Sequence, residues 1–272
     1  MQDKIIPAVI TVMAIIALIF IVKYIIVPAP SSKILEESAP LQTTQIVRET
    51  PSPESAEPEH SAPPKPLPIA EKPLNEPAIL PPPPSLEDSD TQVLLAVADF
   101  APALIQWLIP EQQIRKWVLA IDLMADGKLP KRYRPVDYPM DKFVVEQQGL
   151  DTVAAADNHP RMNAIISTLT SIKPSQLVQY YRQWSPLLEK AYREQGKPDT
   201  FNQRLQQAIN HVLAAKPLSD NPALTRPSVL YRYRDESFEL ATDIDKLLWR
   251  MGPENSARLQ NFLRELHFQL GQ

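Results

Sequence analysis

Residues 5–27 form a nearly uninterrupted apolar run, IIPAVITVMAIIALIFIVKYIIV, which restricts the fold more than any other feature of the sequence. Its first eighteen residues carry no charge. A helix of that length is about 27 Å long, and the hydrocarbon core of a bilayer is about 30 Å thick. The run therefore predicts a single transmembrane helix at residues 5–27. A cleaved signal peptide, whose apolar core is usually about 7–15 residues long, is the main alternative, followed by a buried core helix.

The charges that flank this run do not by themselves determine its orientation. Lys4 lies on one side, and Lys23 and Lys33 lie on the other, so the positive-inside comparison is nearly balanced. Residues 1–4 form a short tail before a large polar remainder, which favours a cytoplasmic tail. In a Gram-negative cell we therefore expect a single-pass protein of the inner (cell) membrane, with its N-terminus in the cytoplasm and the bulk of the chain in the periplasm.

Residues 28–89 hold sixteen of the thirty prolines and no glycine. Each proline fixes φ, removes a hydrogen-bond donor and disfavours helix at the preceding residue. With four Lys and Arg against ten Asp and Glu, the segment is acidic and can bury little apolar surface. We expect a disordered linker, rich in polyproline II conformation, that spaces the domain from the bilayer. In the alternative interpretation, Pro63–Pro68 or Pro81–Pro84 docks on an aromatic groove of a partner.

Apolar residues recur three and four positions apart along residues 90–272, which is the spacing of one helix face. The pattern predicts six or seven helices in one all-α, mostly helical globular domain, with at most one small β-hairpin at residues 143–153. Residues 229–233 alternate like a strand, and residues 217–227 are expected to form a loop. The clearest helical stripes are Ile114, Trp117, Val118, Ile121 and Met124; Leu177, Tyr180, Tyr181, Trp184 and Leu188; and Phe201, Leu205, Ala208, Ile209 and Val212.

Local capping residues predict where three of these helices begin. Ser89 followed by Gln92 has the pattern of a capping box. Pro110 suits the first position of a helix, because its missing N–H would be unpaired there anyway. Asp199 is placed to cap the helix that contains Phe201.

Prolines within the helical pattern predict interruptions. Pro160 should bar helix at His159. Pro186 should bend its helix, since its missing N–H leaves the Arg182 carbonyl unpaired. Gly252-Pro253 should end one helix before the last one begins.

No motif in the sequence identifies a reaction. The five glycines stand apart from one another, so the patterns of nucleotide, dinucleotide and α/β-hydrolase sites are missing. The four histidines form no close ligand pair and there is no cysteine, so we name no catalytic, cofactor-binding or metal-binding residue and expect no cofactor. Residues 90–272 hold 22 Lys and Arg against 21 Asp and Glu, a balance that argues against nucleic-acid binding.

Two basic stretches could form a site if the fold brought them together. Such a cationic, aromatic-edged patch would hold a carboxylate or phosphate through arginine forks. The simpler interpretation is a solvated loop and a strand whose arginines pair with local carboxylates. The candidate residues for binding an anion or a partner are Lys128, Lys131, Arg132, Arg134, Arg232 and Arg234.

Short motifs spread over residues 90–266 carry a resemblance to a known family. They are Pro110-Glu111 with Ile114-Arg115, Gly127-Lys128-Leu129-Pro130 with Arg134-Pro135, Trp184-Ser185-Pro186-Leu187 with Ala191-Tyr192, Phe201 with Leu205 and Ala208-Ile209, Arg226-Pro227-Ser228-Val229, and Arg250-Met251-Gly252-Pro253-Glu254-Asn255. On these residues the chain resembles the bacterial family catalogued as domain of unknown function 3014. The pattern of that family looks like a single N-terminal membrane anchor, followed by a proline-rich tether and this domain. The resemblance implies no activity and supplies no catalytic residue. Asp157-Asn158-His159-Pro160 differs from the tyrosine- and arginine-rich helix start that the resemblance implies there.

The sequence therefore predicts a single-pass membrane protein that presents a helical periplasmic domain. Because no catalytic constellation accompanies the anchor and linker, we expect a non-catalytic envelope scaffold or adaptor that binds an envelope protein. An envelope enzyme that acts on peptidoglycan or another polymer is the alternative. An exposed apolar patch would favour the binding protein, and a deep pocket holding two acidic side chains with raised pKa values would favour the enzyme.

Overall fold

The computed structural model describes residues 79–218 and 220–272. The predicted tail 1–4, the predicted span 5–27 and residues 28–78 of the predicted linker lie outside the described residues. None of the helices in the described part of the chain is both long and apolar enough to cross a bilayer. The described residues begin inside the predicted linker, at Ile79. Ile79 and Leu80 already pack against the core of the domain.

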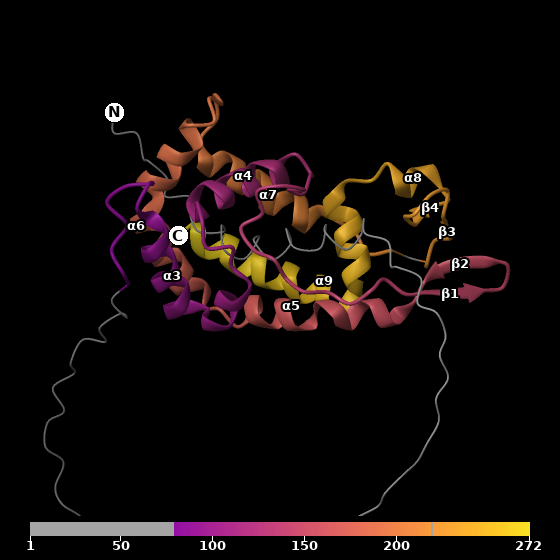
Figure 1. The fold of residues 1–272 in the computed structure, drawn as a ribbon. Coiled ribbons are helices and arrows are strands. Elements are labelled where there is room, and N and C mark those ends of the chain that lie inside the picture. Colours follow the sequence, from indigo (N-terminus) through magenta and orange to yellow (C-terminus); the bar gives the residue numbers. More distant parts are fainter. Residues whose placement is uncertain (1–78, 219) are drawn as a thin grey trace, which may run out of the picture. The chain divides into compact units, whose positions relative to one another are not determined.

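The described residues form a mostly helical fold, as the spacing of apolar residues predicts (Figure 1). The predicted hairpin is present, and two short strands extend it into a four-stranded sheet. In chain order the elements are α3 (Ser89–Phe100), the 3₁₀ helix η2 (Pro102–Trp107), α4 (Gln113–Ala125), β1 (Val145–Gln148), β2 (Asp151–Ala154), the 3₁₀ helix η3 (Ala156–Met162), α5 (Asn163–Thr170), α6 (Pro174–Arg193), α7 (Phe201–Ala214), β3 (Leu224–Thr225), β4 (Arg232–Tyr233), α8 (Glu236–Glu239) and α9 (Asp243–Leu270).

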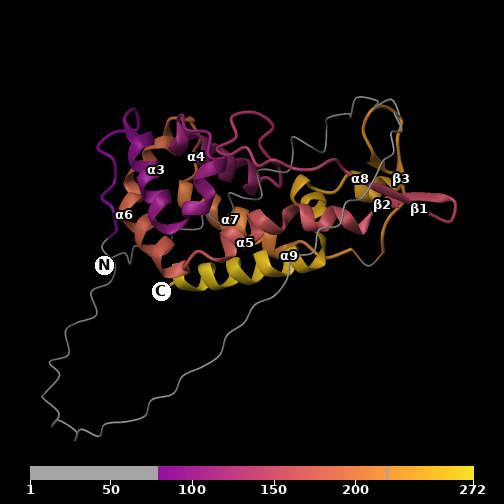
Figure 2. The same cartoon turned by 60° about the horizontal axis from the view of Figure 1, so that its bottom comes forward.

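The sheet has the order β1-β2-β3-β4, and each neighbouring pair is antiparallel. Val145 lies opposite Ala154 in the hairpin, and Leu224 of β3 lies opposite Tyr233 of β4. β3 falls within the segment expected to be loop, and the expected strand at residues 229–233 is reduced to its last two residues. Figures 1 and 2 both show the strands and α8 together at one end of the described domain, with α3 and α6 at the other.

The core lies where the predicted helical stripes meet. α4 packs on α7 and α6, and α9 packs along α5, α6 and α7. Tyr192 of α6 and Phe201 of α7 are fully buried, with ring centroids 6.2 Å apart. Ile121 and Met124 of α4 are also fully buried, as their spacing on one helix face predicts.

Two of the predicted helix starts are wrong. Ser89 is already the first residue of α3, and its hydroxyl donates to the Leu86 carbonyl at 2.8 Å instead of accepting a capping bond. α4 begins at Gln113, beyond Pro110. The hydroxyl of Ser89 is engaged by a carbonyl three residues before it, whereas the start of α4 is set by contacts with the distant Asp90.

Carboxylates from neighbouring helices hold the first N–H groups of α4 and α7. Asp90 of α3 accepts from the backbone N–H groups of Gln112 and Gln113 at 2.7 Å each. Glu189 of α6 accepts from the first two N–H groups of α7 at 3.0 and 3.1 Å. These bonds satisfy donors that an isolated helix would leave unpaired, and they place negative charge at the positive end of each helix.

The local cap of α7 lies one residue after the predicted position. Thr200, not Asp199, is the N-cap residue. Its hydroxyl accepts from the Gln203 N–H at 3.2 Å, and the Gln203 side chain accepts from the Thr200 N–H at 3.0 Å. α7 therefore starts with a complete capping box.

Two internal prolines are accommodated in helical structure. Pro160 lies inside η3, so the predicted bar to helix at His159 is wrong for this short 3₁₀ segment. α6 continues across Pro186. The Ser185 hydroxyl donates to the Arg182 carbonyl at 3.4 Å and takes the place of the N–H that Pro186 lacks.

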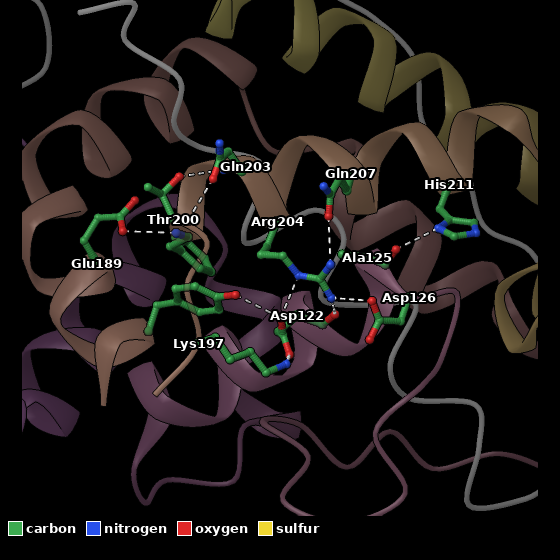
Figure 3. A network of polar contacts seen from close by, with 12 residues as sticks. Asp122, Ala125, Asp126, Glu189, Lys197, Thr200, Gln203, Arg204, Gln207 and His211 are labelled. Carbon is green, nitrogen blue, oxygen red and sulfur yellow. Dashed lines mark hydrogen bonds and ion pairs between the residues drawn. The ribbon is translucent and has the colours of Figure 1, made fainter. Parts of the chain in front are cut away.

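A buried charge network joins α4, α6 and α7 (Figure 3). Asp122 of α4 is 1% exposed, and its carboxylate pairs with Arg204 at 2.7 Å and also with Lys197. Arg204 further donates to the Asp122 carbonyl and to the Asp126 carboxylate, each at 2.6 Å. The Tyr192 hydroxyl donates to Asp122 at 3.3 Å, so both carboxylate oxygens of Asp122 have partners.

The hydrogen bonds of this network set the protonation of its members. Desolvation opposes the charge of Arg204, but its bonds to Asp126 and Asp122 raise its pKa overall. The bond from Arg204 lowers the pKa of Asp126. Burial, followed by the charge of Asp122, raises the pKa of Tyr192 to about 12. With the carboxylate of Asp122 fully paired, the network stabilises helix packing rather than offering a ligand site.

Replacing Asp122 by Asn should lower the free energy of unfolding by about 3–5 kcal/mol, because the buried guanidinium of Arg204 loses the anion it is paired with. Denaturant unfolding followed by circular dichroism measures this change. Asp126→Asn is the matched control, since Asp126 is 44% exposed and a pair at the surface contributes about 1 kcal/mol or less. Equal losses in the two variants would contradict a central role for Asp122.

Acid should weaken the same network. The folded-state pKa of Asp126 is lowered, so its bond to Arg204 contributes stability that is fully present above about pH 4 and is lost as pH falls through the folded pKa. The stability of Asp126→Asn should therefore decline less steeply below pH 4 than that of the unchanged protein. Parallel pH profiles of the two proteins would show that this bond adds nothing.

Candidate binding groove

A cavity of about 490 Å³ opens beside the first part of α9. Ligand sites in proteins commonly have volumes of about 300–1,000 Å³. We call this cavity the α9 groove. Its lining residues come from the β1–β2 hairpin, η3, the α7–β3 connection, β4 and α9, and they are Phe143, Glu146, Ala154, Ala156, Asn158, His159, Ala215, Lys216, Pro217, Leu218, Asp220, Asn221, Tyr233, Leu248, Trp249, Arg250, Gly252, Pro253, Ser256, Ala257 and Gln260.

The groove exists because α9 bends at Gly252-Pro253, where the sequence predicts an interruption. Gly252 has φ 81° and ψ 165°, a backbone conformation that is essentially restricted to glycine. The Ser256 hydroxyl donates to the Leu248 carbonyl at 2.7 Å, which satisfies an acceptor at the bend. A Cβ atom on Gly252 would lie 2.4 Å from Cγ of His159, so the bare backbone lets η3 approach α9 closely.

Two buried asparagines hold η3 in this position. The Asn255 side-chain amide donates to the His159 carbonyl at 3.1 Å and to the Asn163 side chain at 2.9 Å. The Asn158 amide donates to the Val144 carbonyl at 2.6 Å, and its oxygen accepts the Val144 N–H at 2.9 Å. The wall formed by η3 is therefore fixed without a ligand.

Side chains also hold the connection between α7 and β3. The Trp249 indole donates to the Lys216 carbonyl at 2.8 Å. Gln260 donates to the Ala215 carbonyl at 2.9 Å, and Asn221 donates to a carbonyl of β2 at 2.7 Å. Two of these bonds engage the backbone of the connection and the third ties it to β2, so the groove is organised before anything binds.

Arg250 is the central cation of the groove. The residue is half-buried, and its guanidinium lies 5.9 Å from the centroid of the Tyr233 ring. Desolvation lowers the pKa of Arg250, while Tyr233, Glu239 and Asp243 act in the opposite direction. The two carboxylates already accept backbone N–H groups, Glu239 at 3.0 Å and Asp243 at 3.2 Å. Arg250 therefore packs on the Tyr233 ring. Binding of a further anion to its guanidinium would be favourable there.

A second desolvated arginine lies behind the η3 wall. Arg161 donates to the Asn158 side chain at 2.9 Å, and its guanidinium lies 5.9 Å from the centroid of the Phe143 ring. Desolvation lowers the pKa of Arg161, Asp141 opposes this shift, and the charge of Arg250 adds to it. The positive potential around Arg250 therefore has a second source.

The chemistry that this arrangement favours is recognition of an anionic group beside apolar surface. Arg250 supplies a planar donor for a carboxylate or phosphate. Phe143, Tyr233 and Trp249 supply aromatic surface. In the part of the chain that the structure describes, no cluster of His, Asp and Glu side chains could hold a metal ion.

The first group of predicted cationic residues lies in the connection after α4. Lys128, Lys131 and Arg132 are exposed there. Arg134 is half-buried and lies 3.5 Å from Asp137. None of these four residues lines the α9 groove.

In the second predicted group, Arg232 lies on β4 and Arg234 follows the end of that strand. Both are exposed on either side of the buried Tyr233. Because side chains alternate along a strand, Arg232 faces away from the side that Tyr233 presents to the groove. Arg234 pairs with Asp151 of β2 at 2.7 Å. A single patch formed from both groups remains a prediction.

Sequence reasoning did not select Arg161, His159 or Arg250 as site residues. Arg250 follows two apolar helix positions and precedes Met251-Gly252-Pro253, a run that predicts only a helix stop. The available signal was an arginine beside a glycine-proline bend, since such bends often mark functional positions.

Replacing Gly252 by Ala should lower the free energy of unfolding by about 2–4 kcal/mol, because a side chain there is strained and meets the His159 ring. Thermal or denaturant unfolding measures the loss. Adding His159→Ala should restore the part due to the collision but not the backbone strain. Gly149→Ala is the control, since Gly149 also has positive φ but nothing lies within 4 Å of its Cβ position. A loss at Gly252 no larger than at Gly149 would contradict this account.

Comparison with known proteins identifies the family to which the residues of the groove belong. The family model described as "Protein of unknown function (DUF3014)" matches residues 113–267, a range that includes every residue lining the α9 groove. Searches of curated proteins and of solved structures gave no match. Because the matched range covers more than half of the 272 residues, the chain belongs to the DUF3014 family of proteins of unknown function.

Proposed function

We propose that this protein is a non-catalytic, membrane-anchored adaptor whose α9 groove binds an extended segment of an envelope protein through an acidic group. The single observation that carries this proposal is the half-buried Arg250, which lies in a preorganised groove and packs on the Tyr233 ring. An acidic group of the partner would supply the anion that this guanidinium favours.

Charge and shape both support a peptide-like ligand. A carboxylate, either a side chain of Asp or Glu or a chain terminus, matches the planar fork of an arginine. Phe143, Leu248 and Trp249 offer apolar surface to the neighbouring side chains of such a segment. The walls are held by bonds to Lys216 and His159 carbonyls, so little conformational entropy would be lost on binding.

The predicted anchor and linker give this groove its setting. Residues 5–27 would hold the protein in the inner membrane, and the acidic proline-rich linker would keep the domain away from the bilayer. A domain held in this way can reach a partner in the periplasm without leaving the membrane. This arrangement suits an adaptor or scaffold better than a freely diffusing protein.

In-cell photocrosslinking would identify the partner. A photoreactive residue in place of Lys216, which is exposed at the groove, should capture a small and reproducible set of envelope proteins from cells that make the full-length chain. The same residue in place of Glu265, which is exposed on α9 away from the groove lining, is the matched control. Identical capture from both positions would argue against the groove.

Arg250→Gln should weaken binding of the captured partner by about 10- to 100-fold, because a hydrogen bond to a charged group contributes roughly 1.5–3 kcal/mol. Arg264→Gln, at an exposed position of the same helix, should leave the affinity unchanged. Calorimetry or fluorescence anisotropy with the purified full-length protein measures both values. Unchanged affinity in Arg250→Gln would reject the proposed site, and release of fragments from cell-wall polymers by the unchanged protein would favour the enzyme alternative.

A further inference from the structure

The described chain begins with a proline-rich segment that lies on the aromatic side chains of α6. We call Ile79–Pro84 the strap. The Leu80 N–H donates to the Tyr180 hydroxyl at 3.3 Å, and the Leu80 carbonyl accepts from the Trp184 indole at 3.1 Å. The Gln92 side chain donates to the Pro81 carbonyl at 3.1 Å. Main-chain groups thus make the polar contacts of the strap.

Burial differs from residue to residue along the strap and just after it. Ile79 and Leu80 are half-buried, Pro83 is buried between the exposed Pro82 and Pro84, and three residues beyond Pro83 the chain is buried again at Leu86. Three residues per turn is the repeat of the polyproline II helix. One edge of the segment therefore faces the domain, in the same manner in which proline-rich ligands dock on aromatic grooves.

The surface that receives the strap is held in place by its own contacts. We call Phe100, Tyr180 and Trp184 the aromatic face. The centroid of the Tyr180 ring lies 5.3 Å from that of Phe100 and 5.9 Å from that of Trp184. The Tyr180 hydroxyl donates to the Asp99 carboxylate at 2.8 Å, which leaves its oxygen to accept from Leu80. The receiving groups are therefore oriented before the strap docks.

A small apolar cavity lies beside the aromatic face. It measures about 70 Å³, and Phe100, Tyr180 and Trp184 are among its lining residues together with Trp117 and Leu188. This unfilled volume gives the aromatic face room to adjust when one segment leaves and another enters.

We propose that the aromatic face is an exchangeable docking site for proline-rich segments, and that its second occupant is the strap of another copy of this chain. A strap supplied by another copy can make the same hydrogen bonds and apolar contacts as the resident strap. The two arrangements then differ mainly in the entropy cost of bringing a strap to the aromatic face. For a strap from another copy, this cost depends on the local concentration of copies. Copies anchored in one bilayer would be concentrated, and exchange of identical elements is a common route to dimers.

Two complementary variants test this exchange in the full-length protein, kept in detergent because residues 5–27 are predicted to span a membrane. The acceptor variant carries Leu80→Asp and Pro83→Asp, which should release its strap and free its aromatic face. The donor variant carries Tyr180→Phe and Trp184→Phe, which keep both rings but remove the hydrogen-bonding groups for Leu80. Circular dichroism verifies that each variant is folded.

Sedimentation velocity then measures association. An equimolar mixture should form a one-to-one complex at least tenfold more tightly than either variant associates with itself. A labelled synthetic peptide of residues 76–86 should bind the acceptor variant at least tenfold more tightly than it binds the unchanged protein. A donor carrying Trp107→Phe instead of its two substitutions is the matched control, since Trp107 lines neither the α9 groove nor the cavity beside the aromatic face. It should pair with the acceptor less well because its own strap stays docked.

The outcomes separate the parts of the proposal. Folded variants that neither pair nor bind the peptide would overturn the exchangeable site. Peptide binding without pairing of the two variants would overturn the assignment of a second copy as the occupant. Both results are independent of whether the α9 groove binds an acidic partner.

Discussion

The helical part of the structure depends on the burial of Asp122 against Arg204. A charge that is removed from water is tolerated only where partners of opposite charge and hydrogen-bond donors surround it. α4, α6 and α7 can therefore pack closely only in an arrangement that brings Arg204, Lys197 and Tyr192 to this carboxylate. The network thus adds geometric specificity to apolar contacts that could slide along one another.

The position of α7 in turn determines part of the α9 groove. Gln260 of α9 bonds to carbonyl groups at the end of α7 and just after it, at Val212 and Ala215. The connection that follows then contributes Lys216 to the groove and offers its carbonyl to Trp249. The buried network and the groove are therefore linked through α7, although no residue of the network lines the groove.

The sequence predicts the helices and their buried faces because a period of 3.6 residues is a local property. Ile121, Leu177 and Phe201 are buried as their spacing predicts. The starts of helices are harder to predict when their donors are paired by distant residues. Asp90 and Glu189 each cap a helix other than their own, and nothing in the local sequence indicates which helix will lie beside them.

The groove could be predicted only in part for the same reason. Tyr231-Arg232-Tyr233-Arg234 suggests that aromatic and cationic side chains act together, and Tyr233 does line the groove. The guanidinium over its ring, however, belongs to Arg250 on α9. Alternation along β4 places the neighbouring Arg232 on the other side, so the cation nearest in sequence is not the one nearest in space.

The strap also determines how mechanical tension would enter the domain. A pull along the predicted linker would act first on Leu80, where two hydrogen bonds join the chain to α6, and only later on α3. Peeling residues 79–88 away in extended conformation would add about 31 Å of contour length to the tether before α3 begins to unfold. The contacts of the strap with the aromatic face would thus be the first to break when the predicted linker is pulled.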